Sequence, residues 1–191
     1  TFATFVFPFM IFGAFLEKSG AGSFFMDLAT SLTGKWRGGP AKIAVFSSAL
    51  FGSISGSSVA NVVASGSFTI PMMKRVGFKN HHAGAIEAIS STGGQVMPPI
   101  MGAGVFILAT LTESDYLTIA AMNIIPAILF FTFIMLMVDL EAVKSGLKGL
   151  PAEEVPDFKT VIKKGWHFFI PLIVVITLLF NGFSPDYGAF W

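Results

Sequence analysis

Long apolar stretches separated by short clusters of charged residues dominate the chain and predict membrane-crossing helices. The twelve Lys and Arg residues fall at position 18 and within 35–42, 74–79 and 144–164. A straight helical crossing needs about 20 apolar residues, and cytoplasmic loops carry an excess of Lys and Arg. We therefore assign the basic clusters to the cytoplasmic side. The apolar runs cover residues 2–16, 43–73, 83–111, 117–138 and 166–182.

The run 43–73 is too long for one straight crossing, and its flanks KWRGGPAK and MKRVGFKNHH are both basic. The chain should therefore enter and leave on the same side. The centre of the run, FGSISGSSVAN, is rich in Gly and Ser, which interrupt a helix and supply hydroxyls and free backbone groups. We expect a re-entrant helical hairpin with a buried tip. The alternative is a closely packed pair of full spans, although each would have only about 15 residues.

The run 83–111 predicts a discontinuous transmembrane helix, because SSTGGQVMPP stands at residues 90–99 in its middle. Its two glycines and two prolines cannot continue an ordinary helix, since proline lacks the amide donor and clashes with the preceding turn. The far flank, TESDY, has no basic residue, so the chain should emerge there on the opposite side. Residues 117–138 then return, and residues 166–182 cross again.

The remaining segments complete the expected organisation. Residues 22–34 place Phe24, Phe25, Leu28 and Leu32 near helical spacing with Asp27 opposite, which suits a helix lying at the membrane interface. Because the chain begins with Thr inside an apolar run, we expect a piece of a larger protein. The expected units are a truncated transmembrane helix and interfacial connector (1–34), the hairpin with basic flanks (35–82), the broken helix and following span (83–138), a solvated cytoplasmic linker (139–164), and a transmembrane helix with the start of the next segment (165–191).

Composition supports an all-α integral membrane protein and excludes several other classes. The chain is 53% hydrophobic and 12% charged, whereas a soluble domain is about a quarter charged. A net charge of +1 provides no basic field for nucleic acid, so we expect no nucleic-acid partner. The absence of cysteine excludes disulfides, thiolate metal sites and a cysteine nucleophile.

The two interruptions point to one shared site, because broken helices persist in hydrocarbon only where their free backbone groups face protein, water, an ion or a substrate. Carbonyl ends of half-helices, with Ser, Thr and Asn oxygens, suit a small cation such as sodium. Amide ends instead attract a carboxylate. The alternative is simple close packing, since Gly52 and Gly56 form a GxxxG motif. The candidate residues are Ser55, Ser57, Ser58 and Asn61 in the hairpin, and Thr92, Gly93, Gly94 and Pro98 at the break.

Glu87 is the one ionisable residue well inside an apolar run, which makes it a candidate for proton coupling. Two other interpretations are that it reaches the membrane interface or that it pairs with Lys74 or Arg75. An intramembrane serine protease would need a histidine base facing a serine at depth. All three histidines instead flank basic loops, and no HExxH, EF-hand or Walker pattern occurs, so we expect no enzyme.

The segments FGSISGSSVANVVASGSFTIPMMKRVGF and AGAIEAISSTGGQVMPPIMGAGVFI closely resemble the large permease subunit (DctM-like) of TRAP transporters, the tripartite ATP-independent periplasmic transporters. The resemblance is nearest to the fused permeases of the TAXI branch and covers most of the chain. It implies an ion-transporter-superfamily-like repeat, one of two inverted repeats that each contain a re-entrant hairpin and a broken helix. The sodium site of the family maps onto Ser55, Gly56, Ser57, Ser58, Asn61, Thr92, Gly93, Gly94 and Pro98.

The same resemblance implies the function and the partners. It implies a permease of a sodium-coupled secondary transporter that imports small organic acids, such as C4-dicarboxylates, across the prokaryotic inner membrane in a multi-pass arrangement. The implied partners are a periplasmic TAXI-type solute-binding protein, a small membrane subunit, fused or separate, and the lipid bilayer. Sodium is the coupling ion and no other cofactor is expected. Many relatives carry aspartate where Asn61 stands, so Asn61 would coordinate only through its amide oxygen. The alternatives are a proton-coupled exchanger or channel using Glu87, and a structural scaffold without ion dependence.

Overall fold

The computed structural model describes residues 2–181, 183 and 187, and within this part the regular elements are all helical. Two of the helical stretches, Tyr116–Lys144 and Ala152–Phe180, are long and apolar enough to cross a membrane. The elements are α1 (Phe2–Lys18), α2 (Ala21–Thr33), α3 (Gly39–Ser55), α4 (Ser58–Arg75), α5 (Asn80–Gly93), η1 (Gly94–Val96), α6 (Ala103–Thr112), α7 (Tyr116–Lys144), η2 (Ala152–Glu154), α8 (Phe158–Gly165), η3 (Trp166–Phe168) and α9 (Phe169–Phe180).

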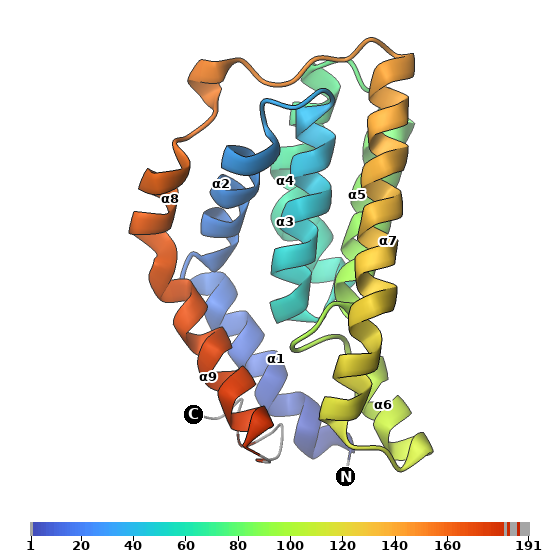
Figure 1. The fold of residues 1–191 in the computed structure, drawn as a ribbon, viewed down its shortest axis with the longest axis vertical. Coiled ribbons are helices and arrows are strands. Elements are labelled where there is room, and N and C mark those ends of the chain that lie inside the picture. The colour runs from blue at the N-terminus through green and yellow to red at the C-terminus, as the bar shows by residue number, and fades with distance from the viewer. Residues whose placement is uncertain (1, 182, 184–186, 188–191) are drawn as a thin grey trace.

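Helices α3 and α4 form a hairpin that turns at two residues. Gly56 adopts a left-handed conformation with φ +59°, which ends α3. Ser57 caps α4, because its hydroxyl oxygen accepts a hydrogen bond from the Ala60 amide at 3.3 Å. Figure 1 shows both arms ending partway along the long axis, with their outer ends at the same end of the molecule. The expected turn is thus present, and its re-entry into a membrane stays a prediction.

The helix formed by the 83–111 run is interrupted as expected. Helix α5 ends at Gly93, the single turn of η1 follows, and a non-helical segment precedes α6 at Ala103. This segment, residues 97–102, is called the break segment below. Figure 1 shows α6 lying beyond the hairpin tip, toward the end of the molecule that also holds the chain termini. The interruption therefore falls near the level at which the hairpin turns.

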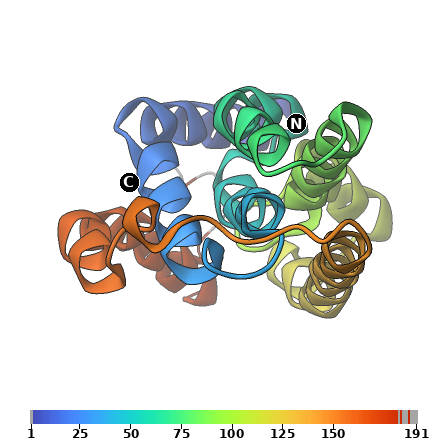
Figure 2. The same ribbon diagram turned by 90° about the horizontal axis from the view of Figure 1, so that it is seen from above.

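Helix α3 lies at the centre of the helical array. It contacts α2, α4, α5 and α7, and the view in Figure 2 shows it surrounded by other helices, with the chain between α7 and α8 passing over it. Most of its residues are buried, Ser47, Ser48 and Ser53 among them. The central helix of this bundle therefore carries buried hydroxyl groups rather than only apolar side chains.

Helix α2 stands beside α3 in Figure 1. Phe24, Phe25 and Leu28 are buried, as expected for one face of a helix, but Leu32 is 38% exposed. The Phe24 ring lies 5.5 Å, between centroids, from the ring of Phe168. This aromatic contact joins α2 to η3, the segment preceding α9. The position of α2 at a membrane interface stays a prediction.

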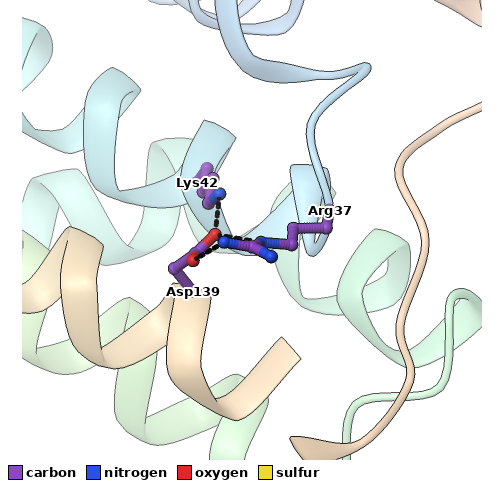
Figure 3. Close-up of polar contacts among 3 residues, drawn as sticks. All are labelled: Arg37, Lys42 and Asp139. Atoms are coloured by element: carbon purple, nitrogen blue, oxygen red, sulfur yellow. Dashed lines mark hydrogen bonds and ion pairs between the residues drawn. The ribbon is translucent and has the colours of Figure 1, made fainter. Parts of the chain in front are cut away.

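The segment expected to be a solvated linker is shorter and more structured than predicted. Helix α7 continues past the apolar run to Lys144, and η2 and α8 occupy part of the remaining stretch. Asp139 explains the extension, because Arg37 donates two hydrogen bonds to it, at 2.9 and 2.6 Å, and Lys42 pairs with the same carboxylate. Figure 3 shows the three side chains converging. The ion pairs fasten the polar end of α7 to the base of α3, a contact that hydrophobic periodicity does not reveal.

Candidate functional site

A cavity of about 540 Å³ lies where the hairpin tip meets the helix break. None of the described residues lining it carries a formal charge. Ligand recognition here would therefore depend on backbone dipoles, hydroxyls and amides. The lining residues are Ser55, Gly56 and Ser57 from the hairpin, Gln95 and Val96 from η1, Ile100, Met101 and Gly102 from the break segment, Ala103, Gly104, Val105, Phe106 and Leu108 from α6, and Asn123 from α7.

Helices of opposite polarity meet at this cavity. Helix α3 ends at Ser55 and η1 ends at Val96, whereas α4 begins at Ser58 and α6 begins at Ala103. The last carbonyls and the first amides of a helix lack partners inside that helix, and they carry the partial charges of its dipole. Unpaired carbonyl oxygens at a helix end suit a cation and unpaired amides suit a carboxylate, so the helix ends beside this cavity are candidates for either role.

Hydrogen bonds hold the break segment against the hairpin, η1 and Tyr116. The Ile100 amide donates to the Ser53 carbonyl of α3 at 3.1 Å, and the Gly102 amide donates to the Gln95 carbonyl at 2.7 Å. The hydroxyl of Tyr116 lies 2.9 Å from the Pro99 carbonyl oxygen and 2.5 Å from that of Ile100. Both sides of the break segment are thus tied to neighbouring elements, which fixes the shape of the cavity.

Glycine allows two close backbone approaches beside the cavity. A Cβ atom on Gly56 would lie 2.0 Å from the carbonyl oxygen of Met101. A Cβ atom on Gly52 would lie 2.4 Å from the Cα of Gly94, which brings α3 against the end of α5. The GxxxG residues therefore do serve close packing, and that packing brings the hairpin to the break.

The predicted hairpin residues lie in or next to the cavity wall. Ser55, Gly56 and Ser57 line it. The Ser58 hydroxyl accepts a hydrogen bond from the Gln95 side chain at 3.2 Å. Asn61 is fully buried outside the lining, where its side-chain amide donates to the Ser48 carbonyl of α3 at 3.2 Å. Asn61 thus lies within the wall rather than on its surface.

The predicted break residues are more dispersed. Thr92 is exposed and its hydroxyl donates to the Ala88 carbonyl of its own helix at 2.8 Å. Gly93 packs against α7, because a Cβ there would lie 2.1 Å from the Phe130 ring. Pro98 lines a separate apolar cavity of about 480 Å³ between the break segment, α7 and α9. Gly94 meets the hairpin directly, because a Cβ atom there would lie 2.6 Å from the Cα of Gly52.

Glu87 is fully buried and hydrogen-bonded to hydroxyl groups. Ser65 and Thr69 of α4 donate to its two carboxylate oxygens, and the Ser91 hydroxyl lies 3.4 Å away. Glu87 does not reach the surface of the structure, and its described partners do not include Lys74 or Arg75; Arg75 pairs with Glu154 instead. Its depth relative to the membrane interface stays a prediction. Glu87 is not among the described lining residues of the cavity.

The sequence analysis did not predict several of the lining residues, although the sequence pattern indicates two of them. Gln95 stands inside the SSTGGQVMPP segment, and Asn123 is an isolated polar residue in the apolar run 117–138. A polar side chain in such a run is a functional candidate. No local sequence pattern indicates the remaining contacts, because they depend on how the helices pack. These are the backbone contacts at Met101 and Gly102 and the hydroxyl contact of Tyr116.

The chain is similar in sequence to known transport proteins. The chain is 29% identical over 182 residues to the C4-dicarboxylate TRAP transporter large permease protein DctM of Pseudomonas aeruginosa, covering 95% of this chain and 42% of that protein. It is 26% identical over 184 residues to the sialic acid TRAP transporter permease protein SiaT of Haemophilus influenzae, with 95% of this chain and 30% of the relative covered. The ectoine/5-hydroxyectoine TRAP transporter large permease protein UehC of Ruegeria pomeroyi is also 26% identical, with coverages of 95% and 42%.

The chain thus spans less than half the length of these relatives. The family described as the DctM component of tripartite ATP-independent periplasmic transporters matches residues 1–191. TRAP permeases are membrane transporters rather than enzymes, so the expected absence of an enzymatic role agrees with the family. The chain therefore belongs to the DctM family of TRAP transporter large permeases.

Proposed function

We propose that the full-length protein is the permease of a sodium-coupled, binding-protein-dependent secondary transporter that imports small organic acids such as C4-dicarboxylates. The support for the substrate class is that some relatives are named as C4-dicarboxylate permeases. Other relatives are named for sialic acid and for ectoine. The substrate of the full-length protein is accordingly part of the proposal.

The observation that carries the proposal is the meeting of helix ends around an uncharged cavity. In the proposed site, sodium binds the oxygen-rich side formed by Ser55, Gly56 and the end of η1. The substrate carboxylate faces the first amides of α6, whose residues line the cavity from Ala103 onward. Because the described lining residues include no cationic side chain, the bound sodium provides the positive charge that the substrate requires.

The contacts between hairpin and break suggest how binding leads to transport. The hydrogen bond from Ile100 to Ser53, and the close approach of Gly56 to Met101, join both walls of the cavity. Sodium would bridge these walls and complete the substrate pocket. We propose that the hairpin, re-entrant in the membrane, then moves together with the break segment to carry ion and substrate across.

The remaining parts of the proposal concern topology and partners. The basic residues on both outer ends of the hairpin support a cytoplasmic location for that end of the molecule. We propose a multi-pass location in the inner membrane, delivery of substrate by a TAXI-type periplasmic binding protein, and a small membrane subunit, fused or separate.

The test uses the full-length permease in liposomes with its binding protein. Uptake of labelled organic acids is measured with an inward sodium gradient, with an inward proton gradient, and with neither. Sodium-dependent uptake that also requires the binding protein supports the proposal. Uptake that follows the proton gradient would contradict it and would favour a proton-coupled exchanger.

A matched pair of serine variants connects transport to the cavity. Ser57→Ala removes a hydroxyl that lines the cavity and caps α4. Ser23→Ala removes an exposed hydroxyl that bonds the Gly20 carbonyl of α2. We expect Ser57→Ala to weaken sodium dependence and Ser23→Ala to leave it unchanged. Normal sodium dependence in a correctly inserted Ser57→Ala permease would contradict the proposed site.

A further inference from the structure

A buried chain of polar groups connects three helices behind the cavity wall. It begins at the Glu87 carboxylate of α5, which lies within hydrogen-bond distance of the Ser65 hydroxyl of α4. The single proton of the Ser65 hydroxyl is shared, because this hydroxyl also lies 2.7 Å from the backbone carbonyl oxygen of Asn61 and 3.3 Å from its side-chain oxygen. The side-chain amide of Asn61 donates to the Ser48 carbonyl of α3 at 3.2 Å. The exposed fractions of Glu87, Ser65 and Asn61 are 0%, 4% and 0%. We call Glu87, Ser65 and Asn61 the buried relay.

The relay ends at the contact that forms the site. The side-chain nitrogen of Asn61 lies 3.3 Å from the position of a Cβ on Gly52, and this same position is 2.4 Å from the Cα of Gly94. Asn61 is therefore adjacent to the point where α3 meets the end of α5. A displacement of its amide would shift that contact, because packed backbone atoms leave no space to absorb it.

We propose that Glu87 is a positioning residue that sets the sodium affinity of the cavity through Ser65 and Asn61. Its carboxylate competes with the two oxygens of Asn61 for the Ser65 proton, and this sets how the Ser65 hydroxyl meets the Asn61 side chain. Asn61 in turn holds α4 against α3 beside the Gly52–Gly94 contact. This arrangement maintains the spacing between hairpin tip and break. The inference rests on the sodium-coupled function proposed above, and it assigns Glu87 a role other than carrying protons.

The charged groups on the surrounding elements have partners other than Glu87, which supports a role for Glu87 within the buried relay. Lys42 of α3 pairs with Asp139 of α7, His82 of α5 lies 3.0 Å from Glu141 of α7, and Arg75 of α4 pairs with Glu154. The described ion pairs do not include Glu87. Its described hydrogen-bond partners are hydroxyls of α4 and of its own helix. The carboxylate thus acts as the shared acceptor that joins α4 to α5.

Ser65 and Thr69 provide a matched pair for the test. Both hydroxyls lie within hydrogen-bond distance of Glu87, but of the two only Ser65 also lies within that distance of the Asn61 side chain. The Thr69 hydroxyl instead lies 3.1 Å from the Ser65 carbonyl oxygen. Ser65→Ala therefore interrupts the relay. Thr69→Val removes one donor to Glu87 and leaves the route to Asn61 intact.

The experiment measures the sodium concentration for half-maximal uptake by the full-length permease in liposomes, with thermal unfolding in detergent as a control. Ser65→Ala should raise this concentration about fivefold or more, the range of ordinary coupling between sites, while Thr69→Val stays close to the parent. Glu87→Gln keeps the side-chain volume and one acceptor oxygen. It should stay nearer the parent than Glu87→Ala and keep the parental pH profile.

Each contrary outcome is distinct. A sodium-dependent parent in which Ser65→Ala and Thr69→Val behave alike would overturn this inference and leave the proposed function standing. Loss of transport together with a changed pH profile in Glu87→Gln would overturn the inference in favour of a proton carrier. The Glu87→Gln variant can be measured even if Ser65→Ala does not fold. A parent without sodium dependence would overturn both the function and the inference.

Discussion

Gly94→Ala tests the contact on which the site depends. Gly94 has ordinary helical angles, φ −59° and ψ −27°, so alanine fits its backbone. The new methyl group would lie 2.6 Å from the Cα of Gly52 and 3.3 Å from the Ser48 carbonyl oxygen. Both are backbone atoms of α3 and cannot rotate away. The helices must separate for the substitution to be accommodated.

The expected free-energy change combines two opposing terms. Overpacking of a tight interior contact costs about 1–3 kcal/mol. Replacing glycine by alanine at a compatible backbone conformation stabilises by about 0.4–1 kcal/mol, because the unfolded chain loses freedom. Gly94→Ala should therefore lower the free energy of unfolding by up to about 2.6 kcal/mol. Separation of the helices should also raise the sodium concentration for half-maximal uptake, by about tenfold for each 1.4 kcal/mol lost from binding.

Gly84→Ala is the matched control on α5. A Cβ at Gly84 would meet no atom within 4 Å, so only the favourable term applies. It should stabilise the protein by about 0.4–1 kcal/mol and leave sodium dependence unchanged. The assays are denaturant unfolding of the full-length permease in detergent and uptake in liposomes. Equal stability and equal sodium dependence in the two variants would refute the reasoning.

Two further substitutions test the supports of the site. Tyr116→Phe removes the hydroxyl that contacts the Pro99 and Ile100 carbonyls. We expect the free energy of unfolding to fall by about 1–3 kcal/mol and the substrate concentration for half-maximal uptake to rise. Unchanged values would contradict a role for Tyr116 in supporting the break segment. Asp139→Asn deprives Lys42, whose side chain is 6% exposed, of its carboxylate, and hydrogen exchange at the end of α7 should accelerate. Glu154→Gln is the control, because Arg75 in that ion pair is 59% exposed and exposed pairs contribute little. Equal effects of the two substitutions would contradict the role of Asp139 in holding α7 to the base of α3.

The glycine and proline positions were sufficient to predict the turn of the hairpin and the interruption after α5. The turn at Gly56 and the interruption after Gly93 both lie inside segments that the sequence marks as non-helical. The reason is local, because glycine and proline change backbone preferences wherever they occur. Ser55, Gly56 and Ser57 line the cavity because they occupy the turn itself.

Contacts between helices could not be predicted in this way, because they depend on the rotation and depth of each helix in the bundle. Pro98 lies in the break segment yet faces a different cavity, and the partners of Glu87 are hydroxyls eighteen or more positions away in α4 as well as in its own helix. The extension of α7 depends on Asp139 meeting two cations from the start of α3 and the segment before it. The role of the site in sodium binding stays a prediction.

Sodium binding to the purified full-length permease is the most direct test of the central claim. Equilibrium binding of labelled sodium is measured with and without the organic acid, and potassium serves as the competing control ion. The opposed helix ends around one cavity predict saturable sodium binding that the organic acid tightens, with sodium tightening the acid by the same factor. Sodium binding that does not saturate, or that the organic acid leaves unchanged, would contradict the account.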